Sequence, residues 1–125
     1  MSMHILVCSR NSVVVDAVSR AFVHHGHRLT VCESGLEVLG AVGVVASDLV
    51  ILDLETPGLG GLLLVSAIKE LAPALPIVAV STRPDLDARA VSQSGVAVAT
   101  LPLGDGSAPH PFLSELARTG RSGAA

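Results

Sequence analysis

Aromatic side chains are nearly missing from this 125-residue sequence, which has two phenylalanines, Phe22 and Phe112, and no tyrosine or tryptophan. A flavin ring is usually held against aromatic surface, so this composition disfavours a flavin-binding protein. Half of the residues are nonetheless hydrophobic. A core can therefore form from valine, leucine, isoleucine and alanine, without disulfides or a structural metal.

Positive charge is also scarce. The formal net charge is −3 and the basic residues form no stripe, so the sequence gives no indication of nucleic-acid binding. The apolar run at residues 5–8 is too short for a signal peptide. Glu37, Ser47 and Asp48 interrupt the apolar run at 36–52, so no membrane span is predicted there. We expect a cytoplasmic protein that binds neither nucleic acid nor membrane.

Cysteine and histidine offer few metal ligands. Cys8 and Cys32 both lie in apolar runs, which indicates buried thiols and not a disulfide framework. His24, His25 and His27 lie together in the sequence, but adjacent histidines on a helix point in different directions, so they would hold one metal poorly. We interpret them as cationic imidazoles near a helix C-terminus.

Short apolar runs rich in β-branched residues recur along the chain. Runs without polar alternation are typical of strands buried on both faces of a parallel sheet. They lie at residues 5–8, 29–32, 49–52, 77–80 and 96–99.

Helical patterns separate these runs. The first has Asn11 or Ser12 as a possible N-cap, an apolar face that ends with His25, and Gly26 as its stop. Further helices are predicted at 64–71 and from about 109–111 onward, with weaker ones at 34–46 and 84–93. Alternating strands and helices predict a flavodoxin-like, doubly wound, three-layer α/β/α fold with a five-stranded parallel sheet in the order 2-1-3-4-5. We expect one domain at 1–119 and a flexible tail at 120–125.

The third strand ends at Asp53, which is followed by Pro57 and Gly61 in a tight loop. In this topology the ligand crevice lies between the first and third strands, so Ser9 and Arg10 should lie near Asp53. An aspartate held close to hydroxyl donors can act as a nucleophile toward a phosphoryl group. The alternative is a structural role, in which Asp53 caps a loop or pairs with Arg10.

Taken in order, several segments resemble the receiver domains of bacterial response regulators. Residues 5–7 are similar to the first strand, Asp53 with Pro57 and Gly61 to the aspartate loop, 76–81 to the fourth strand, and 95–102 to the last strand and its proline. The resemblance implies that Asp53 is the phosphoacceptor and Ser81 the switch hydroxyl that senses the phosphoryl group. It implies a module for two-component or phosphorelay signalling with a histidine kinase as partner, and not an enzyme beyond self-phosphorylation.

The sequence departs from the family pattern at several site positions. Receivers usually carry two adjacent acidic residues after the first strand, which hold magnesium, but Ser9 and Arg10 stand here. Leu101 stands where the family has a phosphoryl-binding lysine, and an aliphatic such as Val98 replaces the aromatic of the last strand.

These departures predict an atypical metal site. Mg²⁺ needs carboxylate oxygens, and a guanidinium repels it, so we expect Mg²⁺ to bind weakly or not at all and no other cofactor to bind. Arg10 is expected to point toward Asp53 or Glu55 and to occupy the space of the metal. Glu55 is interpreted as a solvated loop residue or a further partner of Arg10.

The leading hypothesis is a stand-alone, atypical receiver that acts through protein–protein interaction, with impaired phosphorylation at Asp53. A phosphorylation-independent scaffold, or pseudo-receiver, is the main alternative. A phosphocarrier enzyme domain that uses Cys8 is a further one. The sequence leaves the oligomeric state, the kinase and the downstream partner open.

Overall fold

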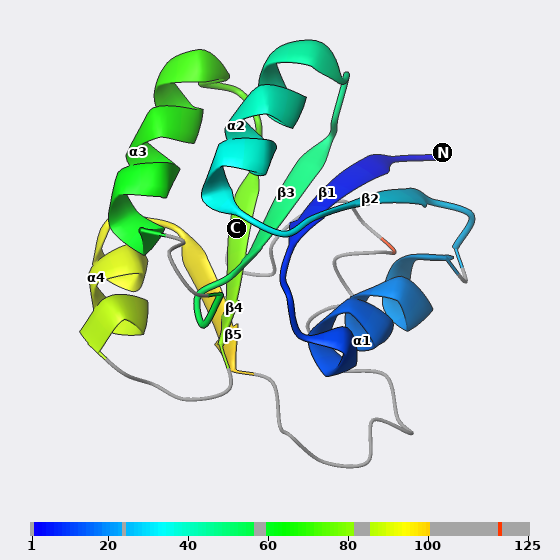
Figure 1. Cartoon of the computed structure of the whole chain (residues 1–125), viewed down its shortest axis with the longest axis horizontal. Helices are drawn as coiled ribbons and strands as arrows, with labels where there is room; N and C mark the ends of the chain where they lie inside the picture. The colour runs from blue at the N-terminus through cyan, green and yellow to red at the C-terminus, as the bar shows by residue number, and fades with distance from the viewer. Residues whose placement is uncertain (1, 24, 57–59, 82–85, 101–117, 119–125) are drawn as a thin grey trace.

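Five strands alternate with four helices in the computed structural model, which describes residues 2–23, 25–56, 60–81, 86–100 and 118 (Figure 1). The strands are β1 (His4–Cys8), β2 (Arg28–Cys32), β3 (Leu49–Asp53), β4 (Ile77–Ser81) and β5 (Ala97–Thr100). The helices are α1 (Ser12–Val23), α2 (Gly35–Val44), α3 (Gly61–Leu71) and α4 (Leu86–Gln93).

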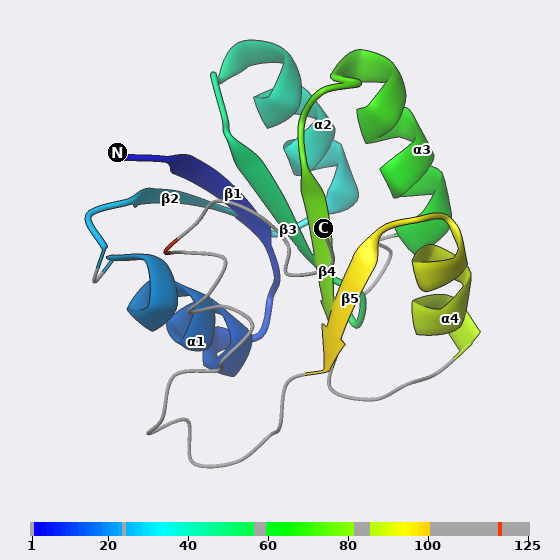
Figure 2. The ribbon, with the colours of Figure 1, turned by 180° about the vertical axis from the view of Figure 1, so that it is seen from behind.

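All neighbouring strands pair in parallel, in the order β2-β1-β3-β4-β5. Helix α1 covers one face of the sheet, and α2, α3 and α4 cover the other (Figures 1 and 2). The predicted flavodoxin-like, three-layer fold and its strand order are therefore confirmed. The predicted last helix and the predicted tail at 120–125 lie outside the described residues.

The central strand β3 is buried along its whole length. Leu49 and Ile51 belong to the hydrophobic cluster on the α1 side, whereas Val50 and Leu52 belong to the cluster under α2 and α3. Side chains alternate between the two faces because a strand has a period of two residues. The buried interior thus fixes the position of Asp53, the last residue of β3.

Helix α1 begins close to the end of β1. Asn11 Oδ1 accepts a hydrogen bond of 2.9 Å from the Val13 backbone N–H, so Asn11 caps the helix, one of the two predicted positions. Gly26 follows the helix with a φ of 77°, as its predicted role as a stop requires. His25 was predicted to lie on the apolar face, but it is exposed beyond the helix end. At 12 residues α1 is the longest described helix, and no helix in the described ranges is long and apolar enough to span a bilayer.

His27 is part of the interior, with an exposed fraction of 7%. Its Nδ1 accepts a hydrogen bond of 2.9 Å from the Met3 backbone N–H, and its ring centroid lies 5.9 Å from that of Phe22. These contacts pack His27 against the end of α1, and its interpretation as a cationic imidazole stays a prediction.

Candidate functional site

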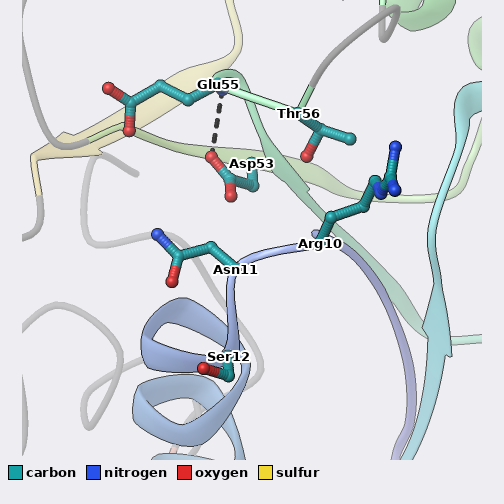
Figure 3. A pocket seen from close by; sticks show the side chains of 6 residues that line it. All are labelled: Arg10, Asn11, Ser12, Asp53, Glu55 and Thr56. Atoms are coloured by element: carbon teal, nitrogen blue, oxygen red, sulfur yellow. Dashed lines mark hydrogen bonds between the residues drawn. The ribbon is translucent and has the colours of Figure 1, made fainter.

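Asp53 lies at the carboxyl edge of the sheet, between the ends of β1 and β4, and only 2% of its surface is exposed. Its Oδ2 accepts a hydrogen bond of 2.6 Å from the Ser9 hydroxyl. Its Oδ1 accepts one of 3.0 Å from the Glu55 backbone N–H (Figure 3). A buried carboxylate needs such donors, because an unpaired charge is costly away from water. The carboxylate is therefore held in one orientation at the predicted site.

Ser9 connects Asp53 to the start of α1. It follows β1 directly, it is 1% exposed, and its Oγ accepts a hydrogen bond of 3.0 Å from the Asn11 backbone N–H. Its own backbone N–H donates to the Cys32 carbonyl at 3.0 Å, which holds the residue against β2. A continuous chain of hydrogen bonds thus runs from the N-terminus of α1 through Ser9 to Asp53. The topology predicted that Ser9 lies near Asp53, but not that Ser9 links Asp53 to α1.

Arg10 lies on the other side of the loop. It is exposed, and its guanidinium points away from Asp53 (Figure 3). Within the described ranges no ion pair joins Arg10 to Asp53 or Glu55, and the Glu55 side chain extends past the far side of Asp53. The predicted contact of Arg10 is therefore not formed in this structure. The reason is local geometry: Ser9 points inward at the end of β1, and the side chain after it points elsewhere.

A cavity of about 600 Å³ opens beside Asp53. Thr56 lines it with an exposed fraction of only 5%, and the Thr56 hydroxyl has no hydrogen-bond partner among the described atoms. Buried hydroxyls are normally paired, so this one calls for an explanation. The lining residues are Arg10, Asn11, Ser12, Asp53, Glu55 and Thr56.

Ser81 ends β4 at the same edge of the sheet and is 2% exposed. Asp53 pairs in register with Val80, and the Leu54 backbone N–H donates to the Val80 carbonyl at 3.0 Å. Ser81 is thus one residue beyond the register partner of Asp53. The structure brings Ser9, Asp53 and Ser81 to one edge, as the topology predicts. Leu101, the residue at the predicted lysine position, lies outside the described residues.

The sequence also matches a known family along most of this fold. The model of the response regulator receiver domain matches residues 5–99, from β1 into β5. The chain belongs to the response regulator receiver domain family. Receiver domains are signalling modules of two-component systems. The match confirms the resemblance that was recognised from the aspartate loop and from the order of the segments around it.

Known relatives agree with this assignment. Over 71 residues, or 57% of the chain, this receiver is 38% identical to the DNA-binding transcriptional regulator NtrC of Klebsiella pneumoniae, and the match covers 15% of that protein. Its fold resembles the phosphorylated cyanobacterial phytochrome response regulator RcpA, with a TM-score of 0.76, 18% identity and 97% of each chain covered. It also resembles a response regulator from Thermotoga maritima, with a TM-score of 0.75, 20% identity, and 94% and 96% of the two chains covered. The chain thus spans a small part of NtrC, and the two structures support the fold.

The side chains around Asp53 do not fit a tightly held magnesium ion. Ser9, a hydroxyl donor, occupies the position next to Asp53 Oδ2, and Arg10 brings a positive charge to the same pocket. No group of three or more histidine, cysteine, aspartate or glutamate side chains in the described ranges could hold a metal. Mg²⁺ binds through carboxylates and other oxygen acceptors, and this ligand set is poor in them. Weak or absent Mg²⁺ binding stays a prediction, and this arrangement supports it.

Cys8 lies inside the receiver core. Its side chain is fully buried, and Cys32 is its register partner on β2. Burial, followed by the nearby Cys32, Asp53 and Glu37, raises the pKa of the Cys8 thiol to about 12. A thiol must ionise to act as a nucleophile. The geometry therefore argues against the alternative in which Cys8 carries a phosphoryl group.

Proposed function

We propose that this receiver is a phosphorelay interaction module in which Asp53 is the phosphoacceptor and Mg²⁺-dependent phosphorylation is impaired. One observation carries the proposal: a buried carboxylate at the ligand crevice of the sheet is bonded to the Ser9 hydroxyl, where receivers usually place a metal-binding acid. The nucleophile of the family is kept, but its metal ligands are replaced.

The arrangement suits transfer of a phosphoryl group without proton transfer. An Asp53 oxygen attacks the phosphorus of a phosphodonor and forms an acyl phosphate, while the bond from phosphorus to the donor breaks and the donor leaves with its electron pair. The hydrogen bond from Ser9 to Oδ2 and that from the Glu55 backbone to Oδ1 each use one lone pair of an oxygen and lower its nucleophilicity. These bonds, together with the poor metal site, are the physical reason for the proposed impairment.

A phosphorylation-independent scaffold is the second candidate. It is favoured by the same hydrogen bond, since a carboxylate satisfied by Ser9 and Glu55 is stable without metal or phosphoryl group. In that case Asp53 has a structural role: it ties the end of β3 to the start of α1. Partner binding would then survive the loss of the carboxylate.

The proposed partners are a histidine kinase, or another phosphodonor protein, and a downstream protein, in the cytoplasm. DNA binding is part of the name of NtrC, but this chain spans only 15% of that regulator, so no DNA contact is proposed here.

Intact-mass spectrometry after incubation with acetyl phosphate separates the two candidates. A receiver that uses Asp53 gains the mass of one phosphoryl group, slowly, and the Asp53→Asn variant gains none. The adduct should be labile to hydroxylamine, as an acyl phosphate is. Absence of any adduct at Asp53, together with unchanged partner binding by Asp53→Asn, would establish the scaffold instead.

A further inference from the structure

We propose that the outward side of α2 and α3 docks a basic amphipathic helix of a partner protein. We call this side the α2–α3 surface, and its central residues are Leu36, Gly40, Val44 and Leu63. Docking there rests on the proposed function, since it assigns the surface and the downstream partner of the interaction module, but it requires no phosphoryl group on Asp53.

Helix α2 is apolar on its outward side as well as on the side that packs against the sheet. Glu37 is the single polar side chain among its 10 residues. Val38 is fully buried, whereas Leu36 is 82% exposed and Val44 is 87% exposed. A helix that is apolar on all sides is normally covered on all sides. The outward side of α2 therefore has the composition of a contact surface.

Helix α3 extends this apolar surface. The two helices lie side by side in both views and contact each other (Figures 1 and 2). Leu36 lies in the first turn of α2 and Leu63 in the first turn of α3, and both helices begin at the carboxyl edge of the sheet. Leu63 is 80% exposed. Large apolar side chains gathered on one exposed side are typical of protein–protein interaction sites.

Two glycines give a partner close access to α2. Leu36, Gly40 and Val44 are spaced by four residues, so they share one side of the helix, and Gly43 is exposed next to them. No described heavy atom lies within 4 Å of the position that a Cβ would take at Gly40 or Gly43. The backbone is thus uncovered between two exposed apolar side chains. A second helix can pack closely there and place its own apolar residues between α2 and α3.

Charge determines which helix fits. Lys69 is the single basic residue between positions 29 and 71, and its Nζ donates a hydrogen bond of 3.3 Å to the Ser94 carbonyl, at the end of α4. An acidic rim around an apolar centre complements a basic helix, and it disfavours a second copy of the same surface or an anionic membrane. The exposed acidic residues that flank the surface are Glu33, Glu37 and Glu70.

Docking can be tested with two synthetic helical peptides of about five turns, titrated into the full chain without a phosphodonor. Both peptides carry leucine on one side, and the other positions are lysine in one peptide and glutamate in its control. The lysine peptide should give saturable amide chemical shifts at residues 35–44 and 61–71, and its affinity should fall as salt rises. The glutamate peptide should bind much more weakly.

Variants of the chain locate the contact. Leu36→Ser and Leu63→Ser should each weaken the affinity for the lysine peptide about tenfold, the scale of burying one leucine side chain. Gly40→Gln should also weaken it, because the added side chain blocks close approach. Its melting temperature should not fall, because glutamine has a higher helix propensity than glycine. Val23→Ser, at an exposed valine of α1 on the other face of the sheet, is the matched control and should leave the affinity unchanged.

Asp53→Asn separates this inference from the proposed function. It cannot form an acyl phosphate, yet it should bind the lysine peptide as the wild type does. If the wild type gains no phosphoryl group but binds the peptide, phosphorylation fails and the docking surface stands. Shifts that never saturate, equal binding of the two peptides, or an equal loss of affinity in Val23→Ser would overturn the docking surface. A dimer in sedimentation equilibrium that Leu36→Ser abolishes would overturn it as well, because the surface would then belong to a second copy of the chain.

Discussion

The strand ends on the two sides of Asp53 can be compared directly, because β1 and β4 flank β3 in continuous parallel register. On the β4 side, Ser81 retains the hydroxyl that the family resemblance implies. On the β1 side, Ser9 and Arg10 replace the acidic pair, and Ser9 donates to Asp53. Both strands pair with β3 in parallel, and the side chains at their ends differ.

The difference shows that the sheet and its site are specified by different residues. Strand interiors such as Leu6 and Ile51 are fully buried, so they fix the register and leave little room for change. Residues after the last paired position face the crevice and contribute little to the core. They can be exchanged without loss of the fold, which is how a receiver keeps its architecture while its metal site is replaced.

Phe22→Ala should give the largest change, a loss of unfolding free energy, because Phe22 belongs to the core and not to the crevice. Phe22 is fully buried between α1 and the sheet, and such truncations cost about 3–5 kcal/mol of unfolding free energy. Arg10→Gln, at an exposed strand end, should change stability by less than about 0.5 kcal/mol. Urea denaturation followed by far-UV circular dichroism measures both. A similar loss of unfolding free energy in the two variants would contradict the conclusion that core residues, and not crevice residues, stabilise the fold.

The sequence predicted the architecture well because apolar runs mark the strands. Burial on both faces was wrong for β2, an edge strand in which only Cys32 is buried and Val31 is 47% exposed. The run at 29–32 became β2 (Arg28–Cys32), and the weak helix at 34–46 became α2 (Gly35–Val44), despite Gly40 and Gly43. Val38 of α2 is fully buried against the sheet, and packing there outweighs the low helix propensity of glycine.

The site was harder to predict. Ser9 and Arg10 are adjacent, and only the pleat at the end of β1 decides which side chain faces Asp53. A shift of one residue exchanges their roles. The run of apolar residues stops at Cys8, so the sequence does not show which of the two following side chains faces Asp53. The orphan hydroxyl of Thr56 likewise has no signature in the sequence.

Replacing both Ser9 and Arg10, which follow β1, by aspartate should restore Mg²⁺ binding. In Ser9→Asp with Arg10→Asp, carboxylates replace the hydroxyl and the cation, and the affinity for Mg²⁺ should rise about tenfold to a hundredfold, the usual scale for changes around a metal site. In EDTA the variant should melt below the wild type, because the new carboxylate at position 9 lies against Asp53. Isothermal titration calorimetry provides the affinity, with Arg10→Gln as the control that removes only the cation. Tight, stoichiometric binding of Mg²⁺ by the wild type would refute the prediction that Ser9 and Arg10 prevent strong metal binding.

The buried thiol beneath the site should make stability depend on alkaline pH. The pKa of Cys8 is raised from 9.0 to about 12 in the folded state, mainly by burial. The unfolded chain therefore loses this proton first, so stability is constant below about pH 9 and falls as pH rises toward 12. The slope is at most about 1.4 kcal/mol per pH unit for one thiol.

Cys8→Val, which keeps the side chain apolar, is the matched variant. It should reduce the slope of unfolding free energy between pH 9 and 10.5, measured by urea denaturation. The pKa of Cys32 is also raised by burial, so part of the slope should remain. An identical slope in wild type and variant would show that Cys8 is not held protonated by the fold.

The conformational change on phosphorylation should be the smallest effect, because the residues after β1 no longer include the metal ligands that would respond to a phosphoryl group. Ser81 is the retained hydroxyl on the β4 side, and one hydrogen bond to a charged group contributes about 1.5–3 kcal/mol. A shift from 1:99 to 99:1 needs about 5.5 kcal/mol. Arg10 cannot supply the rest to α4 and β5, because β1 is separated from β5 by β3 and β4. Phosphorylation should therefore produce at most a partial change on the face formed by α4 and β5.

Amide chemical shifts with and without beryllofluoride test this limit, with Ser81→Ala as the variant that removes the remaining sensor. Shifts at residues 86–100 should be small in the wild type and smaller still in Ser81→Ala. Asp53→Asn should bind a downstream partner nearly as well as the wild type. A ligand changes a population only through contacts that differ between the two states. Large shifts across 86–100 that Asp53→Asn abolishes, together with loss of partner binding, would therefore mean that contacts other than Ser81 read the phosphoryl group and that this receiver is a full phospho-switch.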